Sequence, residues 1–213
     1  MTTLARPMWK FIVPLFALAL LVGCGEQKMN PVRAPAPAVP TSPTTMIKGF
    51  DGKLLSGKHV VTLKTSKGDM TAEIYADAAP KTATNFIVLA QSGYYSDLTF
   101  HRVIPGFMIQ GGDPNGNGTG GSSVFGDTFE DEFDSNPLMA KGYKTGVIAM
   151  ANRGPDTNGS QFFIMDSDYP LPPNYTIFGK VTAGESVIHA IAKVARDGND
   201  RPNTPVTFSV EVQ

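Results

Sequence analysis

The sequence predicts a mainly β protein, an antiparallel barrel with helices at its two ends. Composition is the first reason: glycine (22) and proline (17) are abundant and only 17% of the residues are charged, as in turn-rich β proteins rather than helical bundles. The second is a series of short β-rich runs separated by turn residues, with only two segments of helical spacing. With 213 residues, 41% of them hydrophobic, the chain can form one domain with a real core.

The N-terminal segment is expected to be a targeting signal outside the fold. Residues 1–23 contain Arg6, Lys10 and an apolar run at 11–22 that is short for a transmembrane helix. Cys24 follows as the only cysteine, so no internal disulfide can form. The segment resembles a bacterial lipoprotein signal, which implies lipidation of Cys24, a membrane anchor and a location in the cell envelope facing the periplasm or exterior. An ordinary signal peptide or short anchor with an incidental cysteine is the alternative.

Residues 24–46 are expected to form a tether between this anchor and the folded domain. The segment has no apolar periodicity and is rich in proline, alanine and threonine. Its prolines are Pro31, Pro35, Pro37, Pro40 and Pro43. The sequence shows no internal repeat and no second linker, so the domain is predicted to span 47–213.

The elements of this domain are expected in the following order. Runs at 59–65 and 70–75 form a hairpin, and a helix begins at Pro80 and ends at Gly93, because proline favours the first helical turn and glycine the end. A strand at 99–110 is broken by a Pro-Gly turn, and a glycine loop follows. The other predicted elements are strands at 146–151, 161–165, 175–181 and 206–212, and a second helix at 185–194.

Several functional classes are disfavoured. The net charge is −1 without a basic block, so no nucleic-acid partner is expected. Residues 116–121 fit a G-x-G-x-x-G pattern, but no helix follows to hold a phosphate. Residues 113–118 match half of a calcium loop, yet Val124 stands where a bidentate glutamate is needed. What remains is a loop that needs backbone freedom.

Metal and hydrolase chemistry are also disfavoured. An acidic cluster has no histidine nearby, so it is interpreted as a solvated face rather than a metal site. Its members are Asp127, Glu130, Asp131, Glu132 and Asp134. His59 and His189 are interpreted as surface residues, and Ser160 lacks the G-x-S-x-G elbow of a hydrolase.

Residues 100–113, FHRVIPGFMIQGGD, place an arginine and a glutamine among apolar side chains. Alternation predicts Phe107 and Ile109 on one face and Met108 and Gln110 on the other. An arginine beside an apolar pocket can direct its charge at an amide without losing its proton. The alternative is a half-buried strand with one snorkelling arginine.

Residues 150–164, MANRGPDTNGSQFFI, place amide side chains and a turn-rich loop beside two phenylalanines. Such a surface suits a peptide lying along a barrel wall. An ordinary hairpin with a buried Phe-Phe pair is the alternative.

Together these stretches resemble the cyclophilins, the cyclophilin-type peptidyl-prolyl cis-trans isomerases. FHRVIPGFMIQGGD carries most of the resemblance, and 117–121 (NGTGG), 129–133 (FEDEF) and 158–164 (NGSQFFI) match independently and in order. The resemblance covers most of the chain from about His59. It implies a closed eight-stranded antiparallel barrel capped by two α-helices, and cis/trans isomerisation of X-Pro bonds.

The resemblance also implies roles for individual residues. Arg102 corresponds to the catalytic arginine. The expected walls of the proline pocket are Phe107, Met108, Phe163 and Leu171. The residues expected to hold the substrate backbone or orient the arginine are Gln110, Ala151, Asn152 and Gln161, and those at the rim for residues preceding the proline are Gly118 and Thr157.

One part of the pocket departs from the family pattern. Pro170 stands where members that bind cyclosporin tightly carry a tryptophan, and Tyr175 aligns with a pocket histidine. Weak cyclosporin binding with retained isomerase activity is therefore expected.

The resemblance implies an enzyme that needs no metal or cofactor and acts on proline-containing segments of proteins. With the N-terminal signal, it predicts a lipid-anchored monomer that assists the folding of exported or unfolded proteins. A peptide-binding holdase that needs little catalysis is the main alternative, and a surface adhesin on a stalk is a third hypothesis.

Overall fold

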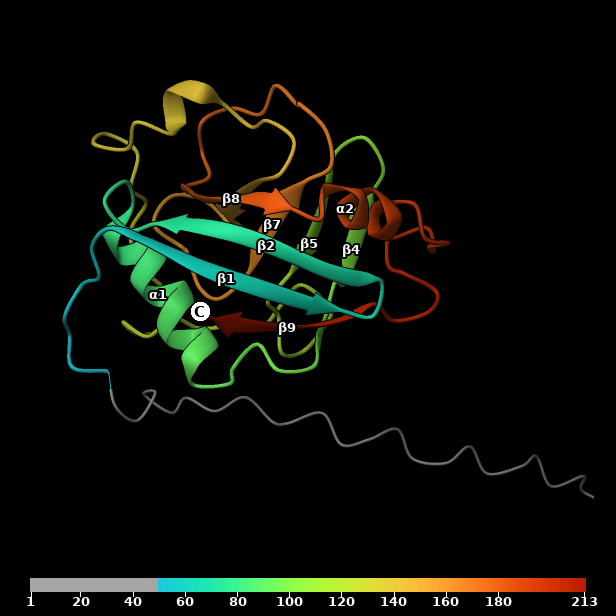
Figure 1. The fold of residues 1–213 in the computed structure, drawn as a ribbon, viewed down its shortest axis with the longest axis horizontal. Helices are drawn as coiled ribbons and strands as arrows, with labels where there is room; N and C mark the ends of the chain where they lie inside the picture. The colour runs from blue at the N-terminus through green and yellow to red at the C-terminus, as the bar shows by residue number, and fades with distance from the viewer. Residues whose placement is uncertain (1–49) are drawn as a thin grey trace, which may run out of the picture. The chain divides into compact units, whose positions relative to one another are not determined.

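The computed structural model describes residues 50–213 (Figure 1), all within the predicted domain at 47–213. The expected signal peptide at 1–23, the lipidated Cys24 and the tether at 24–46 lie outside the described residues. Between residues 50 and 213, no helix has the length and apolar character required to cross a membrane.

Within the described residues, nine strands form one sheet in the order β3-β9-β1-β2-β8-β6-β7-β5-β4, with every neighbouring pair antiparallel. The first two strands form the predicted hairpin, and the other predicted strands are present with shifted ends. The strands are β1 (Lys58–Thr65), β2 (Gly68–Tyr75), β3 (Leu98–Thr99), β4 (Arg102–Ile104), β5 (Met108–Gly111), β6 (Val147–Met150), β7 (Phe162–Met165), β8 (Ile177–Ala183) and β9 (Thr207–Val212).

The sheet corrects the expected closed eight-stranded barrel, because it has nine strands and stays open between β3 and β4. These two edge strands follow each other in the sequence but do not pair with each other. Residues in and between them form backbone hydrogen bonds with the loop that precedes β9 instead. Phe100 N–H donates to the carbonyl of Val206 at 3.0 Å, and Val103 N–H donates to the carbonyl of Asp200 at 2.8 Å. The loop preceding β9 therefore occupies the position where closing strand pairs would form.

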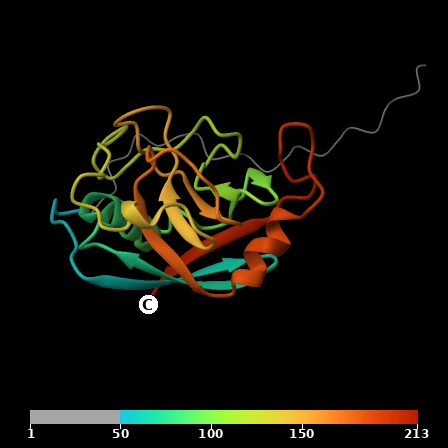
Figure 2. The same ribbon diagram turned by 90° about the horizontal axis from the view of Figure 1, so that it is seen from above.

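Two α-helices lie toward opposite ends of the sheet (Figure 2), as predicted. They are α1 (Pro80–Gln91) and α2 (Glu185–Ala192), and a short 3₁₀ helix, η1 (Met139–Lys141), precedes β6. Gly93, at φ +77°, terminates α1, because this left-handed conformation lets the next amide, that of Tyr94, bond back to Leu89 O at 3.0 Å.

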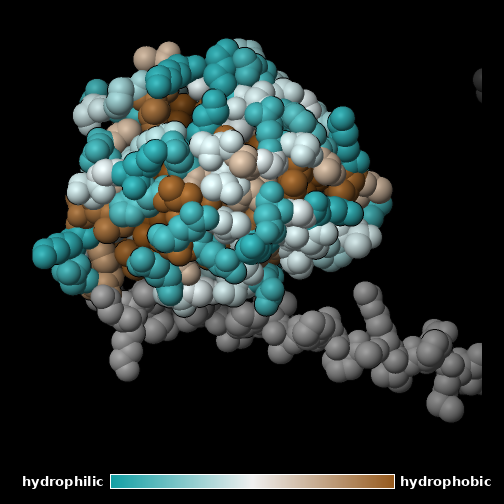
Figure 3. Space-filling model, in the orientation of Figure 1, coloured by the Kyte–Doolittle hydropathy of each residue, from teal (hydrophilic) through white to brown (hydrophobic). Residues whose placement is uncertain are grey.

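The main core combines aliphatic side chains with a group of aromatic ones, among them Phe86 of α1 and Phe162 and Phe178 of the sheet. Phe86 of α1 is fully buried, with its ring centroid 5.3 Å from that of Phe162 and 5.2 Å from that of Phe178. Figure 3 shows mixed hydrophilic and apolar surface on the face where β1 and β2 lie. Among the described residues, the large hydrophobic side chains that are exposed are Leu54 and Tyr169. Burial of the aliphatic and aromatic side chains of this core supplies the main driving force for folding.

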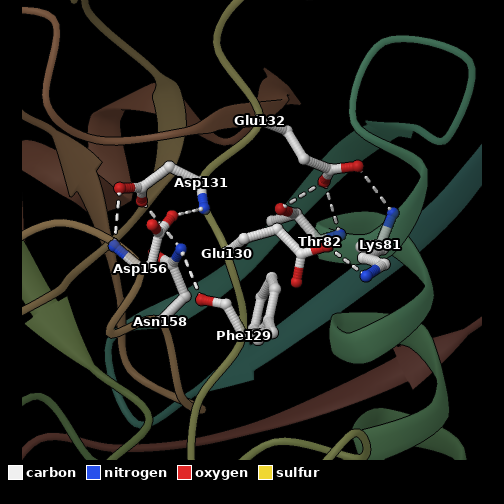
Figure 4. A network of polar contacts seen from close by, with 8 residues as sticks. All are labelled: Lys81, Thr82, Phe129, Glu130, Asp131, Glu132, Asp156 and Asn158. Carbon is white, nitrogen blue, oxygen red and sulfur yellow. Dashed lines mark hydrogen bonds and ion pairs between the residues drawn. The ribbon is translucent and has the colours of Figure 1, made fainter.

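The acidic cluster at 127–134 is not simply a solvated face (Figure 4). The half-buried Glu132 carboxylate accepts hydrogen bonds from Lys81 N (2.9 Å), Thr82 N (2.8 Å) and Thr82 Oγ1 (2.7 Å) in the first turn of α1. Ala79 precedes this helix and offers no capping side chain, so Glu132 caps it from fifty residues away. Glu130 forms an ion pair with Lys81 beside it.

Glu132→Ala is expected to destabilise the protein by about 1–2 kcal/mol, because it leaves two orphan amides of α1 without an acceptor. Glu130→Ala is the matched control, since an exposed ion pair contributes little. Urea unfolding of the two variants measures the difference. Equal losses of unfolding free energy would show that the capping bonds of Glu132 contribute no more than the surface ion pair.

Candidate active site

The β4–β5 hairpin places Arg102 opposite Gln110, with Val103 opposite Ile109. Val103 and Ile109 are fully buried in the main core, so the alternating side chains Arg102 and Gln110 point to the other face. The prediction that Phe107 and Ile109 share a face is wrong. Phe107 lies in the turn before β5, where strand alternation does not apply, and packs instead in a second, smaller hydrophobic cluster.

This second cluster forms the floor of a cavity of about 250 Å³. β5 pairs with β7 so that Gln110 lies opposite Phe163, which brings Met108 and Phe163 into the cluster. The cavity brings together nine residues that the sequence singles out. They are Arg102, Phe107, Met108, Gln110, Ala151, Asn152, Phe163, Leu171 and Tyr175.

Arg102 is the one cation of this cavity, and its side chain is 43% exposed. Its Nε lies 3.9 Å from the Asp200 carboxylate, which also pairs with Arg196 Nε at 3.1 Å. Asp200 was missed from the sequence because it comes from the C-terminal loop, far from the hairpin. It has a left-handed φ of +62°. At 3.9 Å the guanidinium is held loosely and keeps donors free toward the cavity.

Gln110 directs its side chain along the floor of the groove. Its Nε2 donates to Gln161 Oε1 at 3.0 Å. Gln161 Nε2 in turn donates to the carbonyls of Gly118 (3.1 Å) and Gly120 (2.8 Å). The two amides therefore connect β5 to the glycine loop.

The glycine loop is organised around Asp113, which is buried. Its carboxylate accepts hydrogen bonds from the amides of Asn115 (2.8 Å), Asn117 (3.0 Å) and Gly118 (2.6 Å). Gly112, at φ +87°, starts the loop where an added Cβ would lie 2.4 Å from Ser160 O, so only glycine fits. The carboxylate that resembled a calcium ligand is thus used by backbone donors.

A second cavity, of about 70 Å³, adjoins the first and shares Gln110, Ala151 and Asn152 with it. It adds the remaining predicted residues, which are Gly118, Thr157 and Gln161. Thr157 Oγ1 accepts from Arg153 N at 2.8 Å and donates to Gly154 O at 2.7 Å, which fixes the loop at this rim.

Asn152, which lines both cavities, and Asp131 of the acidic segment hold the loops around the groove. Asn152 Nδ2 donates to Asn174 O at 2.8 Å, which ties the end of β6 to the loop carrying Tyr175. Asp131 accepts from Asp156 N at 2.9 Å and from Asn158 Nδ2 at 2.8 Å. Asp131 therefore fixes the loop between β6 and β7, which carries Thr157 (Figure 4), a role that its position in a charge cluster did not reveal.

Tyr143 holds the side of the cavity where the sequence departs from the family pattern. Its hydroxyl donates to Tyr175 O at 2.9 Å and accepts from Tyr175 N at 3.1 Å. Burial raises the pKa of Tyr143 to about 12, so this hydroxyl stays protonated near neutral pH.

The Tyr175 ring packs edge-on against Phe163, with centroids 5.4 Å apart. The Tyr169 ring packs on the Phe107 ring, with centroids 4.6 Å apart. Nothing in the local sequence around Tyr143 marks it as a support of the groove.

Fold and site define a mainly β protein with a groove in which Arg102 lies beside an apolar pocket and a polar rim adjoins it. The model of the family "Cyclophilin type peptidyl-prolyl cis-trans isomerase/CLD" matches residues 60–212. The chain therefore belongs to the cyclophilin-type peptidyl-prolyl cis-trans isomerases and is an isomerase.

Individual relatives agree with this assignment. Peptidyl-prolyl cis-trans isomerase-like 1 of Emericella nidulans is 50% identical over 67% of this chain and 86% of its own length. Peptidyl-prolyl cis-trans isomerase ppi1 of Schizosaccharomyces pombe is 49% identical over 68% and 93%. A crystal structure of a Cryptosporidium parvum cyclophilin-type isomerase superposes with a TM-score of 0.69 at 37% identity, covering 73% of this chain and 98% of that one.

These relatives correct the expected location in the cell envelope. The curated relatives are fungal enzymes, named peptidyl-prolyl cis-trans isomerase-like 1 in Emericella nidulans and ppi1 in Schizosaccharomyces pombe, and they contradict the envelope location assigned from the N-terminal sequence. The bacterial lipoprotein form of the family finds no support in them either.

Gln161→Leu is expected to loosen the glycine loop, because the Gly118 and Gly120 carbonyls lose their shared donor. Amide hydrogen exchange at 113–121 should accelerate about tenfold, and the free energy of unfolding should fall by about 1–2 kcal/mol. Gln91→Leu, the same substitution at an exposed helix end, is the control. Unchanged exchange in the loop would show that Gln161 does not hold it.

Proposed function

We propose that the groove binds an X-Pro segment of an unfolded or otherwise accessible protein chain and that Arg102 catalyses rotation about the prolyl bond. The observation that carries this proposal is the single cavity in which Arg102 faces Phe107, Met108 and Phe163. An apolar pocket suits the proline ring, and one cation at its edge can reach the prolyl amide.

The chemistry follows from the electronic structure of the amide. Rotation breaks amide resonance, which makes the uncatalysed X-Pro reaction slow, with times of tens to hundreds of seconds. In the twisted transition state the proline nitrogen becomes pyramidal and gains a lone pair. A hydrogen bond from the Arg102 guanidinium to this nitrogen strengthens only as the bond twists, so it lowers the barrier without tightening ground-state binding. No covalent bond is made or broken, and the arginine keeps its proton throughout.

The other predicted residues are proposed to position the substrate. Phe107, Met108, Phe163 and Leu171 form the proline pocket, with Tyr175 beside Phe163. Gln110, Ala151, Asn152 and Gln161 face the peptide backbone, and Gly118 and Thr157 contact residues preceding the proline. The adjoining cavity supports this division, because it continues the groove away from Arg102. A structure of the Cryptosporidium parvum relative was determined in the presence of the dipeptide Ala-Pro, which fits a small proline pocket.

We propose that the enzyme acts as a monomer, since one chain supplies every residue lining the groove. No metal, cofactor or nucleic acid enters the proposed reaction. The expectation that its clients are exported proteins depended on the envelope location and is dropped with it. Lipidation of Cys24 and the division at 23, 24 and 46 stay predictions about residues that the structure does not describe.

Arg102→Ala is expected to lower kcat/KM for a short X-Pro peptide by about 10²–10³, the typical loss when one charge-stabilising donor is removed. The measurement is a protease-coupled isomerisation assay. Arg201→Ala, an exposed arginine outside the groove, is the matched control and should keep full activity.

The same pair of variants separates catalysis from simple peptide holding. A holdase would suppress aggregation of an unfolded client equally well with and without Arg102, and would not accelerate isomerisation in either form. Full isomerase activity in folded Arg102→Ala would falsify the proposed mechanism.

Cyclosporin is expected to inhibit weakly, because Pro170 replaces the tryptophan of tightly binding family members. Titration of the isomerase assay with the drug measures this, and a nanomolar inhibition constant would contradict the expectation. Isomerisation in the absence of the drug should be unaffected by this departure.

A further inference from the structure

Asp166 is a buried carboxylate at the end of β7, only 3% exposed and outside both cavities of the groove. Its Oδ2 accepts a hydrogen bond from Gly106 N at 2.6 Å. Its own N–H donates to Phe107 O at 2.9 Å. One residue thus bonds to both sides of the Gly106–Phe107 peptide in the turn between β4 and β5.

The other carboxylate oxygen of Asp166 bonds to α2. His189 Nδ1 lies 2.6 Å from Asp166 Oδ1, and the imidazole is 40% exposed. His189 Nε2 lies 3.8 Å from Glu185 Oε1, one turn earlier in the same helix. α2 packs beside β4 and β5 (Figure 1), so His189 reaches the hairpin from the helix. The histidine is partly exposed, as expected of a surface residue, but it also forms a pair with the buried Asp166 carboxylate.

Phe107 depends on these bonds more than its neighbours do. It precedes β5 and lies outside the strand ladder, so only Ile104 O (3.1 Å from its N) and the Asp166 amide fix its backbone. Gly106, the residue before it, has φ +74°, and a glycine backbone can adopt many turn conformations. The hydrogen bond from Gly106 N–H to the Asp166 carboxylate favours one of these conformations, because hydrogen bonds to ionised groups are stronger than neutral ones.

We propose that Asp166 and His189 are positioning residues that hold Phe107 in place as a wall of the proline pocket. This inference rests on the proposed function, in which Phe107 contacts the substrate proline. It makes α2, which contributes nothing to the groove lining, a support of substrate binding.

The test compares Asp166→Ala, Asp166→Asn and His189→Ala in the full-length protein. In Asp166→Ala, kcat/KM for an Ala-Pro peptide should fall about tenfold, and the peptide Kd, followed by NMR titration, should rise by a similar factor. Asp166→Asn should recover most of the loss, because its side-chain oxygen can still accept from Gly106 N and its amide can still form a hydrogen bond with the His189 ring. His189→Ala should lie between the two, since it removes only the orienting partner.

The Phe107→Ala background separates positioning from a general loss of stability. If Asp166 acts through Phe107, adding Asp166→Ala to Phe107→Ala should lower kcat/KM no further. Asp168→Ala, an exposed carboxylate two residues away, is the control and should keep wild-type activity.

A folded Asp166→Ala with unchanged peptide Kd and kcat/KM overturns the inference, as does an equal loss in the wild-type and Phe107→Ala backgrounds. If Asp166→Ala does not fold, full activity in folded His189→Ala, with no change in Kd, overturns it instead. Each of these results differs from failure of the proposed function, which appears as full activity in Arg102→Ala whatever the Asp166 variants do.

Discussion

The antiparallel pairing of β4 with β5 and of β5 with β7 places Arg102, Gln110 and Phe163 in one row across three strands. The rest of the site depends on this register. A slip of one residue would turn Arg102 into the aromatic core and bring Val103 to the groove, because side chains alternate along a strand. Burial of Val103 and Ile109 in the core makes that slip costly, so the hydrophobic effect itself sets the placement of Arg102 and Gln110 in the groove.

The groove is built on a smaller hydrophobic cluster that is separate from the main core. The main core, centred on Phe86, fixes the sheet, and the capping of α1 by Glu132 supports it from the acidic segment. The smaller cluster contains Met108 and Phe163 and is held by polar bonds at its margins, from Tyr143 on one side and from Asp166 on the other. This division lets the pocket walls be placed by hydrogen bonds while the fold is stabilised by aromatic burial.

The sequence was most informative where local rules decide the structure. Proline and glycine marked the ends of α1, alternation marked the strands, and the motif resemblance singled out residues that the structure brings together around one cavity. It failed where distant contacts decide. Phe107 escaped alternation because it lies in a turn, and Glu132 caps a helix fifty residues away. The partnership of Asp166 with His189 joins two elements with no shared pattern, so no local signal could reveal it. The prediction of a closed barrel was wrong for the same reason, since the loop preceding β9 forms hydrogen bonds with Phe100 and Val103 at the open edge of the sheet.

A crystal structure with a bound Ala-Pro peptide tests the central claim most directly, because the claim is geometric. The account predicts the proline ring against Phe107, Met108 and Phe163, with the Arg102 guanidinium moved from Asp200 to within hydrogen-bonding distance of the prolyl amide. A peptide seated in another cavity, or in this one with Arg102 still paired to Asp200 and directed away from the prolyl bond, would contradict it.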